Sequence, residues 1–536
     1  MSSWNFAEVY EAIAAEQPDA PALIQGETRR SWAELMDRSS GLAAGLLEAG
    51  LSHQSKVAIY TYNCCEYLEG VVATLRAGMV PINTNYRYQA AELAYLWENS
   101  DTEAVIFQGT FTEQVDGLRA QLPLVKLYVH VDDGHGSCPD FAVPFESLAG
   151  SGASIPSGTV RTPDDLIMLY TGGTTGMPKG VMWRQDDLFA RLNGGGFRRW
   201  PDEGRVADIV AGVRESGRGQ TLLPACPLMH GTGLFSALEC FAEAGCVAML
   251  EGRRYDPAEL ASVIEREGVN TAVIVGDPFA RPLLQTLEAE PGRYDLTSLF
   301  AIFSSGAMWS EEIKAGLLEH HGTMILIDAF SSSEALGMGN SVSSKGKEAN
   351  TGTFKLGPEV RVITEDGREV TPGSDEVGVL ALGGRNPMGY YKDEEKSAAT
   401  FRVIDGKRYS VPGDFARVHA DGSIQLLGRG SQCINTAGEK VFPEEVEEVL
   451  KTHPAVADAC VVGVPDERTG ERVVASAELW PGKTAEVEEL IEHVRANLSH
   501  YKAPKQLRII DSIGRAANGK MDYKRHRDEA LTWAQA

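Results

Sequence analysis

Short apolar runs alternate with amphipathic segments over much of the chain. Runs of strand length occur at 56–60, 80–83, 103–107, 272–275, 301–303 and 324–327. Between the first two runs, Tyr67, Val71, Val72 and Leu75 share one helical face. Strands that alternate with helices predict an α/β protein with a mainly parallel sheet covered on both faces.

The first 50 residues predict two helices around a short hairpin. Residues 20–24 form its first strand, and Gly26 and Glu27 form the turn. Ser31 then caps a helix, with Glu34 in the capping-box position. By contrast, the glycines at 194–196 and residues 201–219 form the least structured stretch of the sequence, so we expect a mobile surface loop there.

Residues 354–430 are richer in short alternating strands, separated by Asp-Gly turns, and predict a smaller β-rich unit. The sequence 428–431 is the best boundary. After it, residues 443–450 and 484–498 predict helices, and the strands are expected at 461–464, 473–479 and 507–510. We therefore expect an N-terminal domain over 1–428, a hinge at 429–431 and an α+β domain over 432–536.

Composition narrows the function. The chain has 536 residues, with 50 Lys and Arg against 75 Asp and Glu, so its net charge is −25. That charge repels nucleic acids and anionic lipids. We see no apolar run of about 18 residues, which predicts no membrane span, and expect no signal peptide. The 8 cysteines include no CxxC pair, which disfavours a zinc or disulfide framework and favours the cytoplasm.

The strongest chemical signal is the segment 166–180. An apolar strand leads into Thr171-Gly172-Gly173-Thr174-Thr175-Gly176-Met177-Pro178-Lys179-Gly180. Glycines let backbone N–H groups approach an anion, threonine hydroxyls donate hydrogen bonds, and Lys179 adds positive charge. The spacing differs from a Walker A motif, but the composition is typical of a phosphate-binding loop.

This loop resembles that of the adenylate-forming superfamily, which includes acyl-CoA synthetases, luciferases and the adenylation domains of peptide synthetases. The resemblance continues in order through 227–231, 304–307, 330–334, 412–414, 428–429, 438–440 and 518–520. It implies a large N-terminal α/β domain with a β-rich subdomain, a small mobile α+β C-terminal domain, and activation of a carboxylate with ATP as an acyl-adenylate.

By that resemblance, ATP is bound by residues on both sides of the proposed hinge. They are Thr171, Gly172, Gly173, Thr174, Thr175, Gly176, Lys179, Gly306, Ala307, Phe330, Ser331, Ser332, Ser333, Asp414, Arg429 and Lys520. Phe330 is suited to stack on adenine, and Asp414 to accept the ribose hydroxyls. Glu334 offers the hard oxygen ligand that Mg²⁺ prefers.

The resemblance assigns catalysis to Lys520, Glu334 and His230. Carboxylate attack on the α-phosphate brings two anions together, and the Lys520 ammonium can stabilise that transition state. His230 lines the acyl site, and we assign it no proton transfer. A lysine on a separate small domain also implies domain closure.

Three residues depart from the family pattern. Gly172 replaces the usual Ser of the phosphate loop, and Ser331 replaces the usual Gly after the aromatic residue. Ser431 stands where the hinge usually has Asp or Lys. Rotation requires torsional freedom rather than charge, so Gly430 and Ser431 remain the expected hinge.

Within the superfamily the sequence favours CoA ligation. The segment after His230 lacks the acid that peptide-synthetase domains use, no carrier segment follows, and Gly438, Glu439 and Lys440 resemble the pantetheine path of CoA ligases. The expected acyl-pocket walls are apolar or small: Gly233, Leu234, Ala237, Ala307, Met308 and Leu336. They favour a long-chain, alicyclic or steroid side-chain acid. Aryl or short-chain acids, transfer to a carrier protein and a non-catalytic nucleotide sensor remain alternatives, and a homodimer is compatible with the resemblance.

Overall fold

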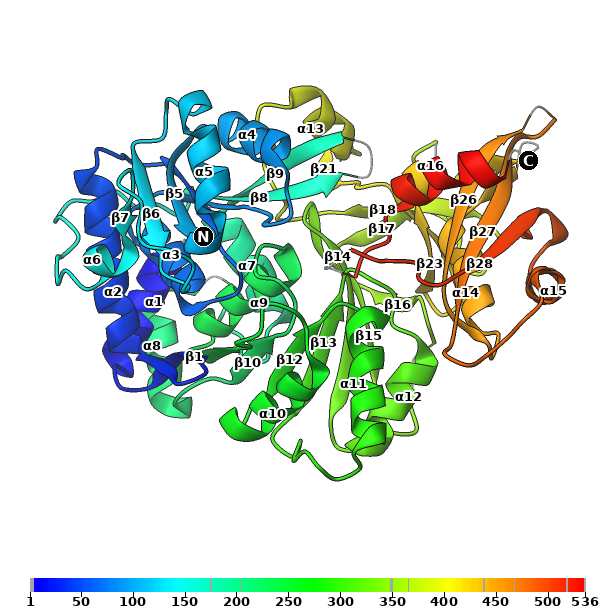
Figure 1. The fold of residues 1–536 in the computed structure, drawn as a ribbon, viewed down its shortest axis with the longest axis horizontal. Coiled ribbons are helices and arrows are strands. Elements are labelled where there is room, and N and C mark those ends of the chain that lie inside the picture. The colour runs from blue at the N-terminus through cyan, green and yellow to red at the C-terminus, as the bar shows by residue number, and fades with distance from the viewer. Residues whose placement is uncertain are drawn as a thin grey trace.

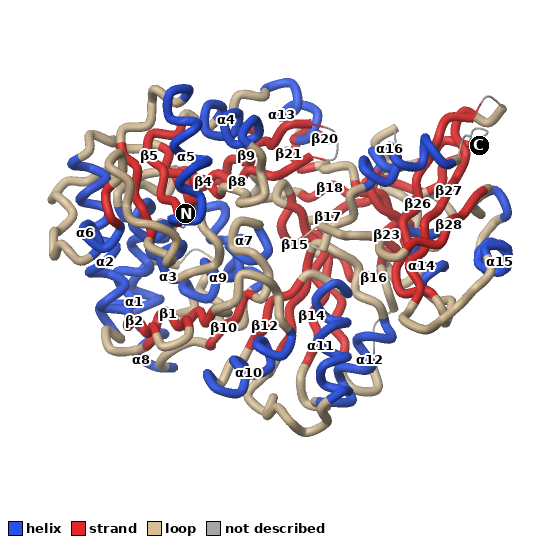
Figure 2. Tube along the Cα trace, viewed as in Figure 1, coloured by secondary structure: helices blue, strands red, loops and turns tan. Residues whose placement is uncertain are grey.

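The computed structural model describes residues 4–534, apart from 174–175, 203, 348–349, 365, 437–438, 467 and 517–518. The chain forms a large N-terminal body and a smaller C-terminal unit, coloured orange to red in Figure 1. Helices cover strands in both parts (Figure 2). No helix in the described ranges combines the length and apolar character needed to cross a membrane.

One eight-stranded sheet carries the first predicted strands. Its spatial order is β19 (Gly389–Tyr390), β9 (Gly176–Arg184), β8 (Leu166–Gly173), β4 (Val80–Asn83), β3 (Lys56–Tyr60), β5 (Thr102–Gln108), β6 (Leu127–Val131) and β7 (Val143–Pro144). The strands from β8 through β4 and β3 to β7 pair in parallel, whereas β8 and β9 form an antiparallel hairpin. The strands expected at 56–60 and 80–83 are confirmed.

A fifteen-stranded sheet carries the other predicted strands. Its order is β2 (Thr28–Ser31), β1 (Pro21–Gln25), β11 (Cys246–Met249), β10 (Thr221–Pro224), β12 (Thr271–Ile274), β13 (Ala301–Ser305), β14 (Ile325–Ser332), β15 (Ala335–Ser343), β16 (Thr353–Leu356), β23 (Ser423–Arg429), β22 (Asp414–Val418), β18 (Val377–Leu382), β21 (Lys407–Ser410) and β20 (Phe401–Ile404), with β17 (Val360–Ile363) beside β18. The parallel strands thus belong to two sheets, and the β-rich unit continues one of them. Local patterns identify strands but not their partners, which tertiary packing decides.

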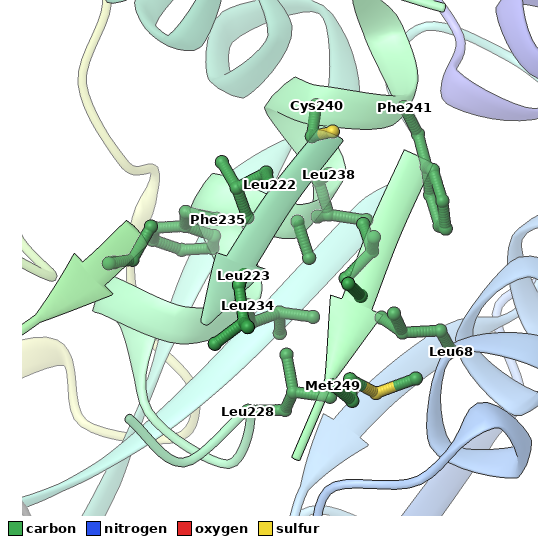
Figure 3. Packing of buried hydrophobic residues seen from close by; sticks show 14 of the residues in the cluster. Leu68, Leu222, Leu223, Leu228, Leu234, Phe235, Leu238, Cys240, Phe241 and Met249 are labelled. Atoms are coloured by element: carbon green, nitrogen blue, oxygen red, sulfur yellow. The ribbon is translucent and has the colours of Figure 1, made fainter. Parts of the chain in front are cut away.

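Helices between the sheets make the main core. These are α1 (Phe6–Glu16), α2 (Trp32–Glu48), α3 (Cys65–Arg76), α7 (Gln185–Gly195) and α9 (Gly231–Ala242). α3 contacts β1 of one sheet and β3 of the other. Figure 3 shows side chains of α9 interleaving with those of β10 and β11. The other helices of this body are α4 (Ala90–Asn99), α5 (Thr112–Leu118), α6 (Phe145–Ala149), α8 (Val206–Ser216), α10 (Pro257–Glu267), α11 (Asp277–Ala289), α12 (Glu311–His320) and α13 (Glu394–Thr400).

The N-terminal hairpin and its cap are confirmed. β1 and β2 pair in antiparallel fashion, and α2 follows directly. The Ser31 hydroxyl accepts a hydrogen bond from the Glu34 N–H at 3.2 Å, and the Ser31 N–H donates to Glu34 Oε2 at 2.7 Å. This reciprocal pair satisfies two donors at the helix start.

The loop expected at 201–219 is wrong, because α8 occupies most of it. Ile209 and Val213 are buried, and the helix packs against α1. Gly212 reflects close packing rather than flexibility, since a Cβ there would lie 2.4 Å from the Trp200 ring. The first two glycines at 194–196 likewise end α7.

The C-terminal unit has the expected α+β composition. Its sheet runs β25 (Glu439–Val441), β24 (Ile434–Thr436), β27 (Gly470–Leu479) and β26 (Val456–Asp466), with β28 (Gln506–Ile510) also beside β27. Its helices are α14 (Pro443–Lys451), α15 (Val487–Asn497) and α16 (Tyr523–Trp533). A hydrophobic core of its own joins α14 and α15 to the sheet. The helix expected from residue 484 begins only at Val487, and the sequence did not predict α16.

Candidate active site

A cavity of about 670 Å³ lies between the N-terminal body and the C-terminal unit. It opens where β13, β14 and β23 end, and α14 and the segment around residue 520 face it. The predicted residues that line it are Thr171, Gly306, Ala307, Met308, Phe330, Ser331, Ser332, Ser333, Glu334, Asp414, Arg429 and Lys520. The fold therefore brings distant parts of the sequence together, in a position typical of ligand sites in α/β sheets.

An aromatic surface lies where β14 reaches the cavity. The Phe330 and Phe354 rings both line it, with centroids 5.6 Å apart. The Ser331 hydroxyl accepts a hydrogen bond from the Gly337 N–H at 2.9 Å, so this departure from the family pattern stabilises the β14–β15 turn. Ser332 Oγ is buried without a hydrogen-bond partner in the described part of the chain. The edge thus offers a stacking face and an unsatisfied hydroxyl to a ligand.

Asp414 and Arg429 meet because β22 and β23 place them opposite each other. Arg429 Nε donates to Asp414 Oδ1 at 3.2 Å. Burial raises the pKa of Asp414, and the Arg429 charge opposes that shift. Asp414 Oδ2 is buried and has no hydrogen-bond donor among the residues described. Since buried acceptors are normally satisfied, this oxygen suits a hydroxyl donor from a ligand.

Glu334 is a buried carboxylate at the cavity wall, in the turn between β14 and β15. Its Oε1 accepts a hydrogen bond from the Tyr390 hydroxyl at 2.8 Å. The described residues contain no group of three or more potential metal ligands from His, Cys, Asp and Glu. A cation at Glu334 would therefore take its other ligands from phosphate and water, which is the usual habit of Mg²⁺.

Lys520 comes from the C-terminal unit and reaches across the cavity. Its Cε lies 3.8 Å from the position that a Cβ on Gly306 would take. Burial and Arg429 lower the pKa of Lys520, while Glu334 and Asp414 oppose the shift. The preceding Gly519 has φ +72°, and a Cβ there would meet Val275 O at 3.1 Å, so glycine permits this close approach.

His230 occupies the N-cap position of α9 beside this site but is not part of the cavity lining. Burial, assisted by the charges of Lys520 and Arg87, lowers the pKa of His230 to about 3. The imidazole is therefore neutral at physiological pH and adds no positive charge beside the cavity.

The expected phosphate loop is the tip of the β8–β9 hairpin. Thr171 pairs with Lys179, and Gly173 with Gly176, so both flanks are strands. Thr174 and Thr175 lie outside the described residues. Lys179 Nζ donates to Asp393 Oδ2 at 2.5 Å and is not part of the cavity lining. The structure therefore brings Thr171 to the cavity and holds Lys179 beside the neighbouring α13.

The acyl-pocket predictions fall in two groups. Ala307 and Met308 line the cavity, whereas Leu234 and Ala237 are enclosed in the main core (Figure 3 labels Leu234). A Cβ on Gly233 would lie 2.6 Å from Pro227 O, so close backbone packing explains that glycine. Half-buried Leu336 packs against the same core.

The proposed CoA path and hinge lie at the start of the C-terminal unit. Glu439 is exposed on β25, and Lys440 follows it in that strand. Gly438 lies outside the described residues. Gly430 begins a 3-10 turn that includes Ser431, and its N–H donates to Gly413 O at 2.9 Å. A Cβ on Gly430 would meet the Phe415 ring at 2.5 Å, so this glycine is also required for packing.

The sequence did not reveal several acids of the cavity. Asp328 lies on β14 and accepts a hydrogen bond from Lys314 Nζ at 3.2 Å. Burial raises the pKa of Asp328 to about 6 although Lys314 opposes the shift. The sequence did hold a signal for Asp328, because an acidic residue stands inside the apolar run 324–329 and acidic side chains are rarely buried without a partner.

Two glutamates of α14 lie where this helix approaches the end of β23: Glu447 is buried, and Glu444 is half-buried with its Oε2 enclosed. A Cβ on Gly428 would lie 2.0 Å from Glu444 Oε2, which has no hydrogen-bond partner in the described chain. Glu447 accepts hydrogen bonds from the Val461 N–H and the Tyr523 hydroxyl. Burial raises the pKa of Glu444 to about 8 and that of Glu447 to about 7, with mutual repulsion adding to the Glu444 shift.

Glu444→Gln is expected to weaken the pH dependence of stability. The folded protein keeps the Glu444 proton at pH values where the unfolded chain has lost it, so the free energy of unfolding falls as pH rises from about 5 to 7. Glutamine removes this one titrating proton, which contributes up to about 1.4 kcal/mol per pH unit to the slope of the free energy of unfolding. Urea unfolding at pH 5, 6 and 7 measures the slope. The exposed Glu488→Gln is the control, and equal slopes in both variants would contradict this expectation.

An aromatic contact joins the two units across the cavity. The Arg281 guanidinium of α11 lies 4.4 Å from the centroid of the Trp480 ring, which follows β27. Arg281 also pairs with Asp277 at 3.3 Å. A cation over an indole face is worth roughly 0.5–2 kcal/mol. This contact stabilises the arrangement in which Lys520 faces Glu334.

Trp480→Ala is expected to slow the step that requires this arrangement. Loss of about 1 kcal/mol lowers the equilibrium ratio of the arrangement in which Lys520 faces Glu334 to other arrangements roughly fivefold. We expect a similar decrease in single-turnover acyl-adenylate formation, with little change in the reaction of preformed acyl-adenylate with CoA. Trp533→Ala is the matched control, because its partner Arg508 belongs to the same C-terminal unit. Equal slowing of both half-reactions would count against the contact's role.

Comparisons with known proteins agree with this geometry. A family model described as AMP-binding enzyme matches residues 10–392, and one described as AMP-binding enzyme C-terminal domain matches residues 445–520. A 3-oxocholest-4-en-26-oate–CoA ligase from Rhodococcus rhodochrous is 39% identical over 98% of this chain and 96% of its own length. The medium-chain acyl-CoA ligase Mig from Mycobacterium avium is 38% identical over 99% of both chains.

Solved structures share the fold. The anthranilate CoA ligase AuaEII in complex with anthranoyl-AMP has a TM-score of 0.84 at 20% identity, covering 100% of this chain and 99% of its own. ATP-bound MatB from Rhodopseudomonas palustris has a TM-score of 0.79 at 24% identity, covering 98% and 99% of the two chains. The resemblance seen in the sequence motifs is thereby confirmed, and the chain belongs to the AMP-binding enzyme family.

Proposed function

We propose that this protein is an AMP-forming acyl-CoA ligase for a hydrophobic carboxylic acid. In the first step a carboxylate oxygen bonds to the α-phosphorus of ATP, and pyrophosphate leaves with the electrons of the broken P–O bond. In the second step the CoA sulfur bonds to the acyl carbon, AMP leaves, and the thiol proton passes to solvent.

The observation that carries this proposal is the meeting of Lys520 with Glu334 and Asp414 in one cavity. These residues come from both units of the chain, and the electrostatic partners of Lys520 include both carboxylates. A cation facing a nucleotide-sized cavity of about 670 Å³ suits a reaction between two anions.

The residues that line the cavity divide the work of the first step. Phe330 supports the adenine, and Asp414 Oδ2 accepts ribose hydroxyls beside Arg429. Thr171 lies where the β8–β9 hairpin, called the phosphate hairpin below, reaches the cavity. Mg²⁺ held by Glu334 would supply charge neutralisation on the phosphates. Lys520 lies between the attacking carboxylate and the α-phosphate and offsets the charge that accumulates there.

The second step requires rearrangement of the C-terminal unit. We assign residues 1–428 to the ATP- and acyl-binding domain, 429–431 to the hinge and 432–536 to the mobile domain. Rotation about Gly430 and Ser431 would withdraw Lys520 and bring β25, with Glu439 and Lys440, toward the pantetheine path. Holding thiol and acyl-adenylate together supplies most of what thioester formation needs.

Two observations support a hydrophobic carboxylic acid as the substrate. Ala307 and Met308 give the cavity an apolar side. The two curated relatives are named for a steroid side-chain acid and for medium-chain acyl groups. A long-chain, alicyclic or steroid side-chain acid is therefore the substrate class that we propose.

Pyrophosphate release with ATP, Mg²⁺ and CoA across a panel of acids tests this function. The panel extends from acetate through medium- and long-chain fatty acids to aryl and steroid side-chain acids. We expect release that depends on a hydrophobic acid, together with the matching acyl-CoA. Release without an acyl-CoA product would favour transfer to a carrier protein. No release with any acid, despite ATP binding, would favour a nucleotide sensor.

A further inference from the structure

The segment around Tyr390 lies against the phosphate hairpin, although sequence reasoning gave it no role at the site. β19 pairs with β9, so that Tyr390 lies opposite Val181. The Met388 N–H donates to Met182 O, and the Tyr391 N–H to Gly180 O, each at 2.8 Å. Main-chain hydrogen bonds thus fix this segment to the strand that follows the phosphate tip.

Tyr390 connects strand β9 to Glu334. Its side chain is buried, and its hydroxyl donates to Glu334 Oε1 at 2.8 Å. A carboxylate that accepts one such bond still has acceptor positions for a cation.

Asp393 binds Lys179, a charged residue of the phosphate hairpin. Asp393 Oδ2 accepts from Lys179, while Oδ1 caps α13 by accepting the Lys396 N–H at 2.9 Å. The Ser397 hydroxyl accepts the Tyr390 N–H at 2.8 Å and donates to Asp393 O at 2.6 Å. This turn therefore fixes Tyr390 and the partner of Lys179 relative to each other.

We propose that Tyr390 is a positioning residue that orients the Glu334 carboxylate for the divalent cation accompanying the triphosphate. The inference rests on the proposed function for its nucleotide. Partners that orient metal-binding side chains contribute roughly 10- to 100-fold to metal affinity. Tyr390 performs this task from the strand that borders the phosphate hairpin, so cation and phosphate sites keep a common geometry.

Binding of Mn²⁺ with α,β-methylene-ATP, followed by electron paramagnetic resonance, tests the proposal. Tyr390→Phe keeps the ring and removes the hydroxyl, and we expect Mn²⁺ affinity to fall about 10-fold or more. Nucleotide binding without a divalent cation should stay unchanged. Tyr391→Phe is the matched control, because its hydroxyl binds Asp101 at 2.7 Å, away from Glu334.

A double variant separates positioning from general structural support. If Tyr390 acts through Glu334, then adding Tyr390→Phe to Glu334→Gln should cause no further loss of Mn²⁺ affinity. Equal Mn²⁺ affinity in Tyr390→Phe and Tyr391→Phe, or additive losses in the double variant, would overturn the proposal. Because the readout is binding, a wild-type protein that forms no acyl-adenylate would count against the proposed function alone.

Discussion

Lys520→Ala is expected to slow acyl-adenylate formation by roughly 10²- to 10³-fold, the loss typical of removing one preorganised charge donor from a transition state. The expected cause is local. Lys520 reaches the cavity edge near Gly306, where its electrostatic partners include Glu334 and Asp414. Without the ammonium, the attacking carboxylate and the α-phosphate repel each other with little compensation.

The slowing in Lys520→Ala should be confined to acyl-adenylate formation. ATP binding should change by less than about 10-fold, because Phe330 and Asp414 remain, and preformed acyl-adenylate should react with CoA at near the normal rate. Single-turnover pyrophosphate release and acyl-CoA formation measure the two steps. Lys524→Ala is the control, since Lys524 is an exposed lysine of α16 whose 3.4 Å hydrogen bond goes to Asp528. A Lys520→Ala protein with the full adenylation rate would refute the assigned role.

The elements that the sequence predicted well are those whose burial is set locally. The runs at 56–60 and 80–83 are mostly apolar and form β3 and β4. The prediction for the segment 201–219 failed because the charges and glycines in it were given more weight than Val206, Ile209, Val210 and Val213, which recur at helical spacing. Tertiary contact with α1 stabilises that helix, and local periodicity does not report such contacts.

The candidate site likewise contains residues that the sequence could predict and residues that it could not. Asp414 and Arg429 could be proposed from motifs, and the register of β22 and β23 places them together. Tyr390 and Trp480 could not, because their contacts with Glu334 and Arg281 join segments far apart in the chain. A resemblance transfers the residues named in its motifs, whereas residues that only support them appear once the fold is known.

Asp414→Asn is expected to abolish discrimination between ATP and 2′,3′-dideoxy-ATP. Asp414 Oδ2 is buried without a donor among the described residues, so ribose hydroxyls would satisfy it. A hydrogen bond to a charged group contributes roughly 1.5–3 kcal/mol, so the wild type should bind ATP at least about 10-fold more tightly than the dideoxy analogue.

The variant should bind ATP more weakly and leave dideoxy-ATP binding nearly unchanged, because the lost interaction is the one that the analogue lacks. Calorimetric titration of both nucleotides into both proteins gives the coupling directly. Asp421→Asn is the matched control, since Asp421 is an exposed turn residue that accepts from Ser423. If Asp414→Asn still preferred ATP as strongly as the wild type, then the orphaned oxygen would have another partner. The ribose would then have to bind elsewhere along the cavity.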